Sequence, residues 1–157
     1  MHGVGMDDKD RQLIRELQRN GRLTNQELAE KVNLSPSPCL RRLRMLEETR
    51  VIQGYTALID QKAYGLPITV FIRIRLDRHS KDVIHAFEDR VRRIDEILDC
   101  FLMTGDSDYL LRVIVESLEA YEDFVRREIH NIPGVASIDT SFAYGTIKQS
   151  KVYPWRG

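Results

Sequence analysis

Two groups of polar side chains in this sequence have the chemistry to bind a charged partner. The first is Arg41, Arg42 and Arg44, three arginines within five residues. Guanidinium groups pair with phosphate oxygens and read guanine through two parallel hydrogen bonds, so this run predicts contacts to nucleic acid. The second group is the polar segment 104–109, which combines a glycine, hydroxyl groups and the carboxylates of Asp106 and Asp108.

Segment 104–109 has the groups that would hold a small zwitterion. Free backbone N–H groups in a glycine-containing turn bind a carboxylate, and Asp106 or Asp108 would accept hydrogen bonds from an ammonium group. The same composition is typical of an ordinary hairpin turn, in which Asp108 ties its own loop together. Local chemistry alone favours the ordinary turn, so both interpretations stay open at this point.

Paired carboxylates also suggest an enzyme or a divalent-cation site, but the rest of the sequence does not support one. No histidine, third carboxylate or nucleophile lies near Asp106 and Asp108 in the sequence, the four histidines lack metal-ligand spacing, and no nucleotide-binding or hydrolase motif occurs. Cys39 and Cys100 lie in apolar patterns, which predicts small buried side chains, although Cys100 is close enough to Thr104 for a redox sensor. We therefore expect no catalysis, no metal and no cofactor.

Composition excludes several further classes of protein. The 157 residues carry 24 basic and 24 acidic side chains, so any surface for nucleic acid must be a local patch. Residues 1–52 hold ten Lys or Arg and eight Asp or Glu, a net charge of +2, and the remainder carries −2. No apolar stretch is long enough for a membrane span and no secretory signal opens the chain. We expect a cytoplasmic protein with no membrane partner.

Three short helices are predicted in the first fifty residues. The first spans 7–20, the second follows Thr24, which forms a capping box with Glu27, and the third follows Ser35. Between the last two helices, Asn33 tolerates the left-handed backbone of a tight turn. Two helices joined by such a turn, the second with an arginine cluster, indicate a helix-turn-helix. The alternative is a plain three-helix bundle with a solvated basic face.

The sequence between residues 51 and 65 predicts a connection between two domains. Residues 51–59 have the pattern of two short strands around Gly54, a hairpin that would serve as a wing or as a tether. Residues 60–65 predict one helical turn closed by glycine. We place the domain boundary near residues 52–65.

The remaining hundred residues predict alternating strands and helices in the order βαββαβ, the ferredoxin-like arrangement. The run 97–103 is almost continuously apolar, which predicts a buried central strand. Such a sheet has both helices on one face, and its other apolar face needs cover that a second copy of the chain would supply. The predicted helices follow Ser80 and Ser117, and the predicted strands span 67–77, 97–103, 109–115 and 135–144, with a further strand over 147–152.

In their order along the chain, these motifs resemble the Lrp/AsnC family, the leucine-responsive or feast/famine transcription regulators. The resemblance covers about Met6 to Pro154. Each piece is weak alone, and the shared order makes the resemblance specific. It is carried by Asp10-Arg11-Gln12-Leu13-Ile14, Gly21-Arg22-Leu23-Thr24, Leu28-Ala29, Asn33-Leu34-Ser35-Pro36-Ser37-Pro38-Cys39, Arg42-Leu43-Arg44-Met45-Leu46-Glu47, Ile52-Gln53-Gly54-Tyr55, Thr104-Gly105-Asp106-Ser107-Asp108-Tyr109-Leu110-Leu111 and Pro133-Gly134-Val135.

The resemblance implies an α+β chain in three parts. A winged-helix-like helix-turn-helix DNA-binding domain would span 6–52, a hairpin or linker 53–65, and a ferredoxin-like βαββαβ effector and oligomerisation domain 66–154. The resemblance also implies a homodimer that forms through the sheet and assembles further, often into octamers. It implies an amino-acid effector bound between subunits, and a place in the cytoplasm with the nucleoid of a bacterium or archaeon.

The expected sites follow from the segments that match the family. The DNA-reading helix would be 35–48, where Met45 replaces a frequently basic residue. Effector contacts vary among members, so the resemblance does not name the amino acid. The expected contacts to double-stranded DNA are Thr24, Asn25, Ser35, Ser37, Pro38, Arg41, Arg42 and Arg44. The expected effector contacts are Thr104, Gly105, Asp106, Ser107, Asp108 and Tyr109, with Thr140 and Ser141 from the partner strand.

The sequence therefore predicts a sequence-specific DNA-binding transcription regulator whose assembly or DNA binding responds to an amino acid. A dimer would present two recognition helices to half-sites about one helical turn apart. One alternative is a nucleoid-architectural protein that wraps DNA with no small-molecule response, which a small ratio of specific to non-specific affinity would favour. Another is a metabolic enzyme or allosteric subunit that uses Asp106 and Asp108, which an absence of DNA binding would favour.

Overall fold

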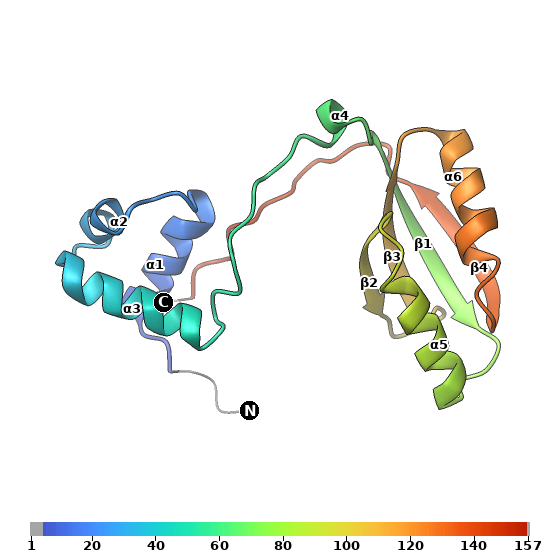
Figure 1. Ribbon diagram of the computed structural model, residues 1–157, viewed down its shortest axis with the longest axis horizontal. Helices are drawn as coiled ribbons and strands as arrows, with labels where there is room; N and C mark the ends of the chain where they lie inside the picture. Colours follow the sequence, from blue (N-terminus) through green and yellow to red (C-terminus); the bar gives the residue numbers. More distant parts are fainter. Residues whose placement is uncertain (1–4, 157) are drawn as a thin grey trace. The chain divides into compact units, whose positions relative to one another are not determined.

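The computed structural model of the chain describes residues 5–156. The chain forms two compact units, each with its own hydrophobic core (Figure 1). The helical unit contains the chain up to Leu58 together with the C-terminal tail from Ile147, and the second unit spans Ile59–Thr146. No helix in the described part of the chain is long and apolar enough to cross a membrane.

Three helices build the helical unit: α1 (Asp8–Arg19), α2 (Asn25–Lys31) and α3 (Pro36–Glu48). Each helix is too short to be stable alone in water, so burial of its apolar face against the other two must supply much of its stability. The buried core consists of Leu13, Leu28, Ala29, Val32, Cys39 and Leu46. Cys39 is thus the small buried side chain that its apolar pattern predicts.

The connection between α2 and α3 has the geometry of a helix-turn-helix. Thr24 and Glu27 form the predicted capping box at the start of α2. Asn33 has a φ angle of 53°, which is the left-handed conformation expected of it. The Leu34 N–H donates to the Ala29 carbonyl at 2.9 Å, and Ala29 is almost fully buried. A small side chain at this point lets the two helices approach closely, and the predicted helix-turn-helix is confirmed.

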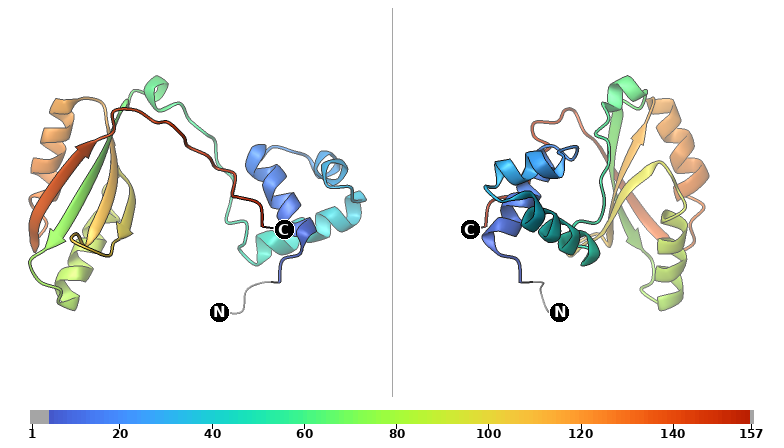
Figure 2. Two further views of the ribbon diagram at one scale, coloured as in Figure 1. Left: turned by 180° about the vertical axis from the view of Figure 1, so that it is seen from behind. Right: turned by 60° about the vertical axis from the view of Figure 1, so that its left-hand side comes forward.

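The second unit is an antiparallel sheet with two helices on one face (Figure 2). The strand order β2-β3-β1-β4 confirms the predicted βαββαβ arrangement. The last turn of α6 widens into a short π-helix, η1. The elements are α4 (Gln61–Tyr64), β1 (Ile68–Leu76), α5 (Lys81–Val91), β2 (Ile97–Leu102), β3 (Tyr109–Val115), α6 (Leu118–Phe124), η1 (Val125–Ile129) and β4 (Val135–Phe142).

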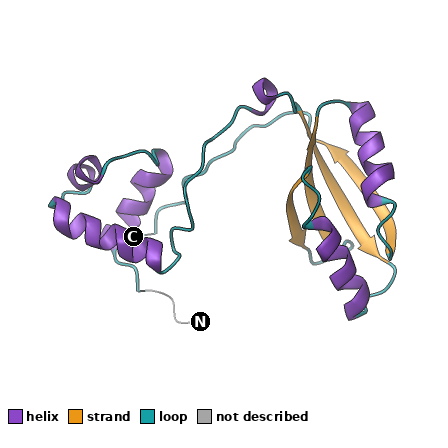
Figure 3. Cartoon of the chain, viewed as in Figure 1, coloured by secondary structure: helices purple, strands orange, loops and turns teal. Residues whose placement is uncertain are grey.

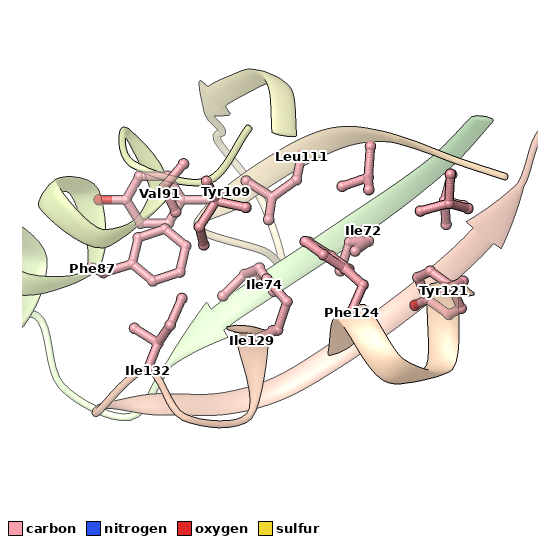
Figure 4. Packing of buried hydrophobic residues seen from close by; sticks show 14 of the residues in the cluster. Ile72, Ile74, Phe87, Val91, Tyr109, Leu111, Tyr121, Phe124, Ile129 and Ile132 are labelled. Carbon is pink, nitrogen blue, oxygen red and sulfur yellow. The ribbon is translucent and has the colours of Figure 1, made fainter. Parts of the chain in front are cut away.

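The core of the second unit lies between the sheet and its helices (Figure 4). Alternate side chains of β1 and β3 point into it, as the period of two in the sequence predicts. The intervening side chains of both strands therefore point to the opposite face of the sheet. The fully buried members of the core are Val70, Ile72, Ile74, Phe87, Leu111, Val113, Phe124 and Ile129.

Strand β2 is not the buried central strand that its apolar run predicts. It lies at the edge of the sheet and pairs with β3 alone. Cys100, Phe101 and Leu102 are exposed, so the prediction of a buried Cys100 is wrong. An apolar run gives no information on which strands flank it, because strand order depends on pairing between distant segments.

Residues 51–59 and 147–152 contain none of the predicted strands (Figure 3). Extended backbone becomes a strand only where another strand forms a ladder with it, and neither segment has such a ladder in the described chain. The tail groups with the helical unit, although the predicted C-terminal domain extended to residue 154. Ser35 and Ser80 precede α3 and α5 as expected, but neither side chain makes a capping hydrogen bond.

Candidate functional site

The outer face of α3 presents a basic stripe. Ser37, Arg41, Arg44 and Glu48 are all exposed, and their spacing of three or four residues places them on one side of the helix. Together with Leu40 and Met45 they line a shallow groove of about 390 Å³. Among the described residues, the ion pairs that α3 forms involve Arg42 only. The guanidinium groups of Arg41 and Arg44 are therefore available to phosphates or base edges.

Arg42 points to a different part of the unit. Its Nη1 lies 2.8 Å from Asp7 Oδ2 and 2.8 Å from Asp10 Oδ1. Asp7 and Asp10 form the capping box that begins α1, so this arginine joins the recognition helix to the start of the first helix. The hydrogen bonds to Asp10 and then Asp7 raise the pKa of Arg42. The backbone N–H of Asp10, followed by Arg42, lowers the pKa of Asp7.

The sequence contains a signal for this difference among the arginines. Arg42 stands three residues after Cys39 and four before Leu46, and both of those side chains are fully buried. A residue with that spacing belongs to the inward face of the helix, whereas Arg41 and Arg44 do not. Only 2% of Asp10 is exposed, and a buried carboxylate needs a charged or hydrogen-bonding partner. Because the three arginines stand so close in the sequence, the sequence alone predicts them as one group.

Four other expected DNA contacts surround the start of the recognition helix. Thr24 is exposed, but its hydroxyl is engaged with Glu27 in the capping box. The Asn25 Nδ2 donates to the Pro36 carbonyl at 2.8 Å, so Asn25 fixes the first turn of α3. Ser35 is exposed and Pro38 is half-buried. The structure thus brings all of these residues to the first turns of α2 and α3.

The polar segment 104–108 connects β2 to β3 at one end of the sheet. The Met103 N–H donates to the Asp108 carbonyl at 2.8 Å and closes the turn. Gly105 has a φ angle of 102°, a backbone conformation that residues with a side chain rarely adopt. Thr104 and Asp106 are exposed, while Ser107 is half-buried. The tip of the turn therefore presents a hydroxyl, a carboxylate and backbone to solvent.

Asp108 anchors this turn to the end of β1. Its Oδ2 accepts the Leu76 N–H at 2.7 Å, and its Oδ1 lies 2.8 Å from His79 Nε2. Its own N–H donates to the Ile74 carbonyl at 2.9 Å. The Leu76 N–H, and next the His79 side chain, lower the pKa of Asp108. Asp108 thus ties the loop together, as the ordinary-turn interpretation describes.

Tyr109 directly follows the turn and is buried in the core between the sheet and α5. It is 3% exposed, its ring lies 4.5 Å from that of Phe87, and its hydroxyl donates to Glu88 at 3.0 Å. Burial, followed by the hydrogen bond to Glu88, raises its pKa to about 12. Because so little of the ring is exposed, a ligand at the turn would meet the tip residues rather than Tyr109.

Thr140 and Ser141 lie elsewhere on the sheet. Tyr109 pairs with Ile74 of β1, whereas Thr140 and Ser141 pair with residues two and three positions before Ile74. Thr140 Oγ1 is hydrogen-bonded to the Tyr121 hydroxyl beneath the helices. Ser141 Oγ accepts from Arg73 Nη1 at 3.5 Å on the opposite face. One chain does not bring these two residues to its own turn.

The sheet face opposite the helices combines apolar and paired charged side chains. Arg73 pairs with Asp139 at 3.3 Å, and Arg112 pairs with Asp99. The apolar side chains at the intervening positions are only partly buried or exposed, and no element of the described unit covers them. They are Phe71, Phe101, Leu110 and Ile114.

A helix-turn-helix with a free basic stripe, joined to a separate βαββαβ domain, defines a DNA-binding transcription regulator with its own ligand-binding domain. The family model for the Lrp/AsnC ligand binding domain matches residues 69–153, and that for a winged helix-turn-helix DNA-binding domain matches residues 6–53. The chain belongs to the Lrp/AsnC family of transcription regulators. The fold and the family that the sequence predicts are both confirmed.

Individual relatives agree with this assignment. The chain is 40% identical over 148 residues to the leucine-responsive regulatory protein of Escherichia coli K12, covering 94% of this chain and 90% of the relative. It is 41% identical over 142 residues to the Bkd operon transcriptional regulator of Pseudomonas aeruginosa, covering 90% and 93%. A transcriptional regulator of Neisseria meningitidis, solved in complex with L-Met, matches with a TM-score of 0.90 at 40% identity, covering 95% and 96% of the two chains.

Proposed function

We propose that this chain is a homo-oligomeric regulator that reads DNA with α3 and responds to an amino acid held at the turn 104–108. The observation that carries the DNA-reading part is the stripe of Arg41 and Arg44, which is exposed and free of ion pairs in the described chain. Such a regulator works on DNA in the cytoplasm.

The DNA interface divides into reading and positioning residues. Arg41 and Arg44 contact base edges or phosphates of the DNA. The exposed Ser35 and Ser37, at the start of α3, contact the DNA backbone. Arg42 holds α3 against α1, because its Nη1 is occupied by two carboxylates. Thr24, Asn25 and Pro38 fix the first turns of α2 and α3. The solvent-facing atoms of these residues add contacts to DNA phosphates.

The effector site is built from the exposed tip of the turn. Thr104, Gly105, Asp106 and Ser107 offer a carboxylate for the ammonium group of an amino acid and N–H groups for its carboxylate. Asp108 and Tyr109 hold the tip in place. The L-Met complex of the Neisseria relative supports an amino acid as the ligand class.

The homo-oligomer is argued from the uncovered sheet face. Phe71, Phe101, Leu110 and Ile114 remain without cover in one chain, and a second sheet packed against them would bury this surface. Such a dimer also allows Thr140 and Ser141 of one subunit to complete the effector site of the other. Dimers then assemble further into octamers.

One experiment tests DNA reading and another tests the effector. Selection of duplexes from a random pool by the full chain should enrich a pseudo-palindrome with half-sites about one helical turn apart. Enrichment of no sequence, with tight binding to any duplex, would support the architectural alternative. A complete absence of binding would contradict the DNA-reading proposal.

A thermal-shift panel of amino acids, including L-methionine and L-leucine, tests the effector. A ligand at 100 times its dissociation constant adds about 2.7 kcal/mol, and each kcal/mol moves the midpoint by about 2–4 °C at this chain length. Asp106→Ala should abolish the shift without lowering the midpoint of the free protein. A panel with no shift would contradict an amino-acid effector.

A further inference from the structure

The C-terminal tail, residues 147–156, has no place in the function described so far. It follows the effector unit in sequence, yet it groups with the helical unit. One residue past β4, the Ala143 N–H still donates to the Thr69 carbonyl at 2.9 Å. Residues 144–151 are then exposed and belong to no strand or helix. The tail is therefore a direct extension of β4 that ends in the helical unit.

The end of the tail contacts α1. The Tyr153 N–H donates to Gln18 Oε1 at 3.0 Å. The Arg15 guanidinium lies 6.0 Å from the centroid of the Trp155 ring, within the range of a cation–π interaction. Arg15 and Gln18 are three residues apart, so they share one face of the helix. These contacts attach residues 153–155 to the side of α1.

Exposure changes along the tail in the way an anchored end requires. Ile147 is fully exposed at 101%, whereas Val152 is half-buried and Trp155 is 46% exposed. The Tyr153 side chain stays 74% exposed, because this residue is held through its backbone N–H. The anchor thus consists of the last few residues, and the segment before it is a free span. A large aromatic side chain at the end of such a span gains apolar contact that the span itself lacks.

We infer that this tail is a second tether, docked on α1 by the Tyr153 backbone and the Trp155 ring, that connects β4 of the effector unit to the DNA-binding unit. The linker after α3 is the first connection. A unit held at two points samples fewer orientations than a unit held at one, because the second attachment closes a loop. The consequence for DNA binding rests on the proposed function, whereas the docking itself does not.

Intrinsic fluorescence tests the docking directly, because Trp155 is the only tryptophan of the chain. We expect the anisotropy of the full chain to decay slowly, since a docked ring rotates with the unit. The double variant Arg15→Ala/Gln18→Ala should add a fast component of local side-chain motion and raise acrylamide quenching by about twofold. Arg19→Ala, one turn further along α1 and paired with Glu16, is the matched control and should change neither value. Equal mobility in the wild type and the double variant would overturn the docking.

A pair of DNA duplexes tests the tether. The wild type and Arg15→Ala/Gln18→Ala should bind a single selected half-site equally, because α3 is intact in both. On the duplex with two half-sites, the variant should bind about threefold to tenfold more weakly, since its recognition helices are less restricted. Equal affinity for the two-site duplex would overturn the tether.

Two further comparisons keep the result interpretable. If the double variant binds the single half-site poorly, Trp155→Ala replaces it, with the fully exposed Tyr144→Ala as its control. Trp155→Ala must then show the same selective loss on the two-site duplex, or the tether is overturned. If the wild type selects no duplex, the proposed DNA function fails, and the anisotropy measurement still decides whether the tail is docked.

Discussion

The guanidinium of Arg42 lies 2.8 Å from the carboxylate of Asp10, a side chain that is almost completely buried. This pair joins α3 to the capped start of α1. On the same helix, the nearby Arg41 and Arg44 face solvent. Neighbouring arginines of one helix thus have different surroundings, and substitutions can measure what this difference does.

Substitution of Arg42 should lower the stability of the folded chain more than it changes the DNA sequence that the chain prefers. Arg42→Met keeps most of the apolar stem and leaves Asp10 without its charged partner, so the free energy of unfolding should fall by about 1–3 kcal/mol. Urea unfolding of the full chain measures this. Asp10→Asn in the same background should cost less than it does in the wild type, because the two residues are coupled. Additive effects of the two substitutions would show that they do not interact.

Arg41→Ala and Arg44→Ala should weaken DNA binding and leave the stability of the chain unchanged. Both side chains are exposed and form no ion pair with residues 5–156, so the midpoint of thermal unfolding should stay within error. An arginine that reads a base should cost about 1–3 kcal/mol of binding and relax the preference at one position of the site. One that touches only phosphate should weaken binding to all sequences and reduce the salt slope by about one. Lys62→Ala, in α4, is the control for loss of a positive charge, and an equal effect there would remove the stripe from the interface.

Asp108 should make stability depend on pH in acid. Its pKa is lowered in the folded chain, chiefly by the Leu76 N–H, so the unfolded chain binds this proton more readily. The stabilisation is therefore complete above the usual pKa of about 3.9 and is lost as the pH falls through the folded value. Urea unfolding between about pH 6 and about pH 3 should show a steeper decline for the wild type than for Asp108→Asn. Parallel curves would show that this carboxylate contributes nothing to the acid response.

Gly134→Ala should destabilise the second unit. Gly134 has a φ angle of 87°, and an added Cβ would stand 2.5 Å from Val83 Cγ1. Backbone strain and the clash with α5 together should cost about 2–4 kcal/mol. Gly54→Ala is the matched control, because open space surrounds that glycine. Circular dichroism melts compare the two variants, and equal midpoints would contradict the packing of Gly134 against α5.

Local signals predicted the elements whose causes are themselves local. The capping box of Thr24 and Glu27 marked the start of α2, and Asn33 marked the turn, because each acts through its immediate neighbours. In β1, the apolar side chains at every second position match the alternation of buried and less buried side chains in the structure. The order βαββαβ followed from these elements and required no contact between distant residues.

Features that depend on distant contacts were not predictable in the same way. The apolar run of β2 has the same pattern at the edge of a sheet as in its centre, and only pairing with β3 places it there. The docking of Trp155 on α1 joins residues separated by most of the chain. Arg42 is an intermediate case. From the sequence it is grouped with the DNA contacts, although its spacing from Cys39 is that of an inward position, and its carboxylate partners on α1 could be known only from the fold.

The place of the tail changes how charge is divided within a neutral chain. With the tail included, the helical unit holds thirteen basic and eight acidic side chains, whereas the second unit holds eleven and sixteen. A cut at residue 52 hides most of this difference, because Lys148, Lys151 and Arg156 then count with the second unit. The protein is thus a pair of oppositely charged bodies of +5 and −5 with no net charge. At low ionic strength the negative unit should repel a polyanion, so we expect a duplex to bind at the helical unit.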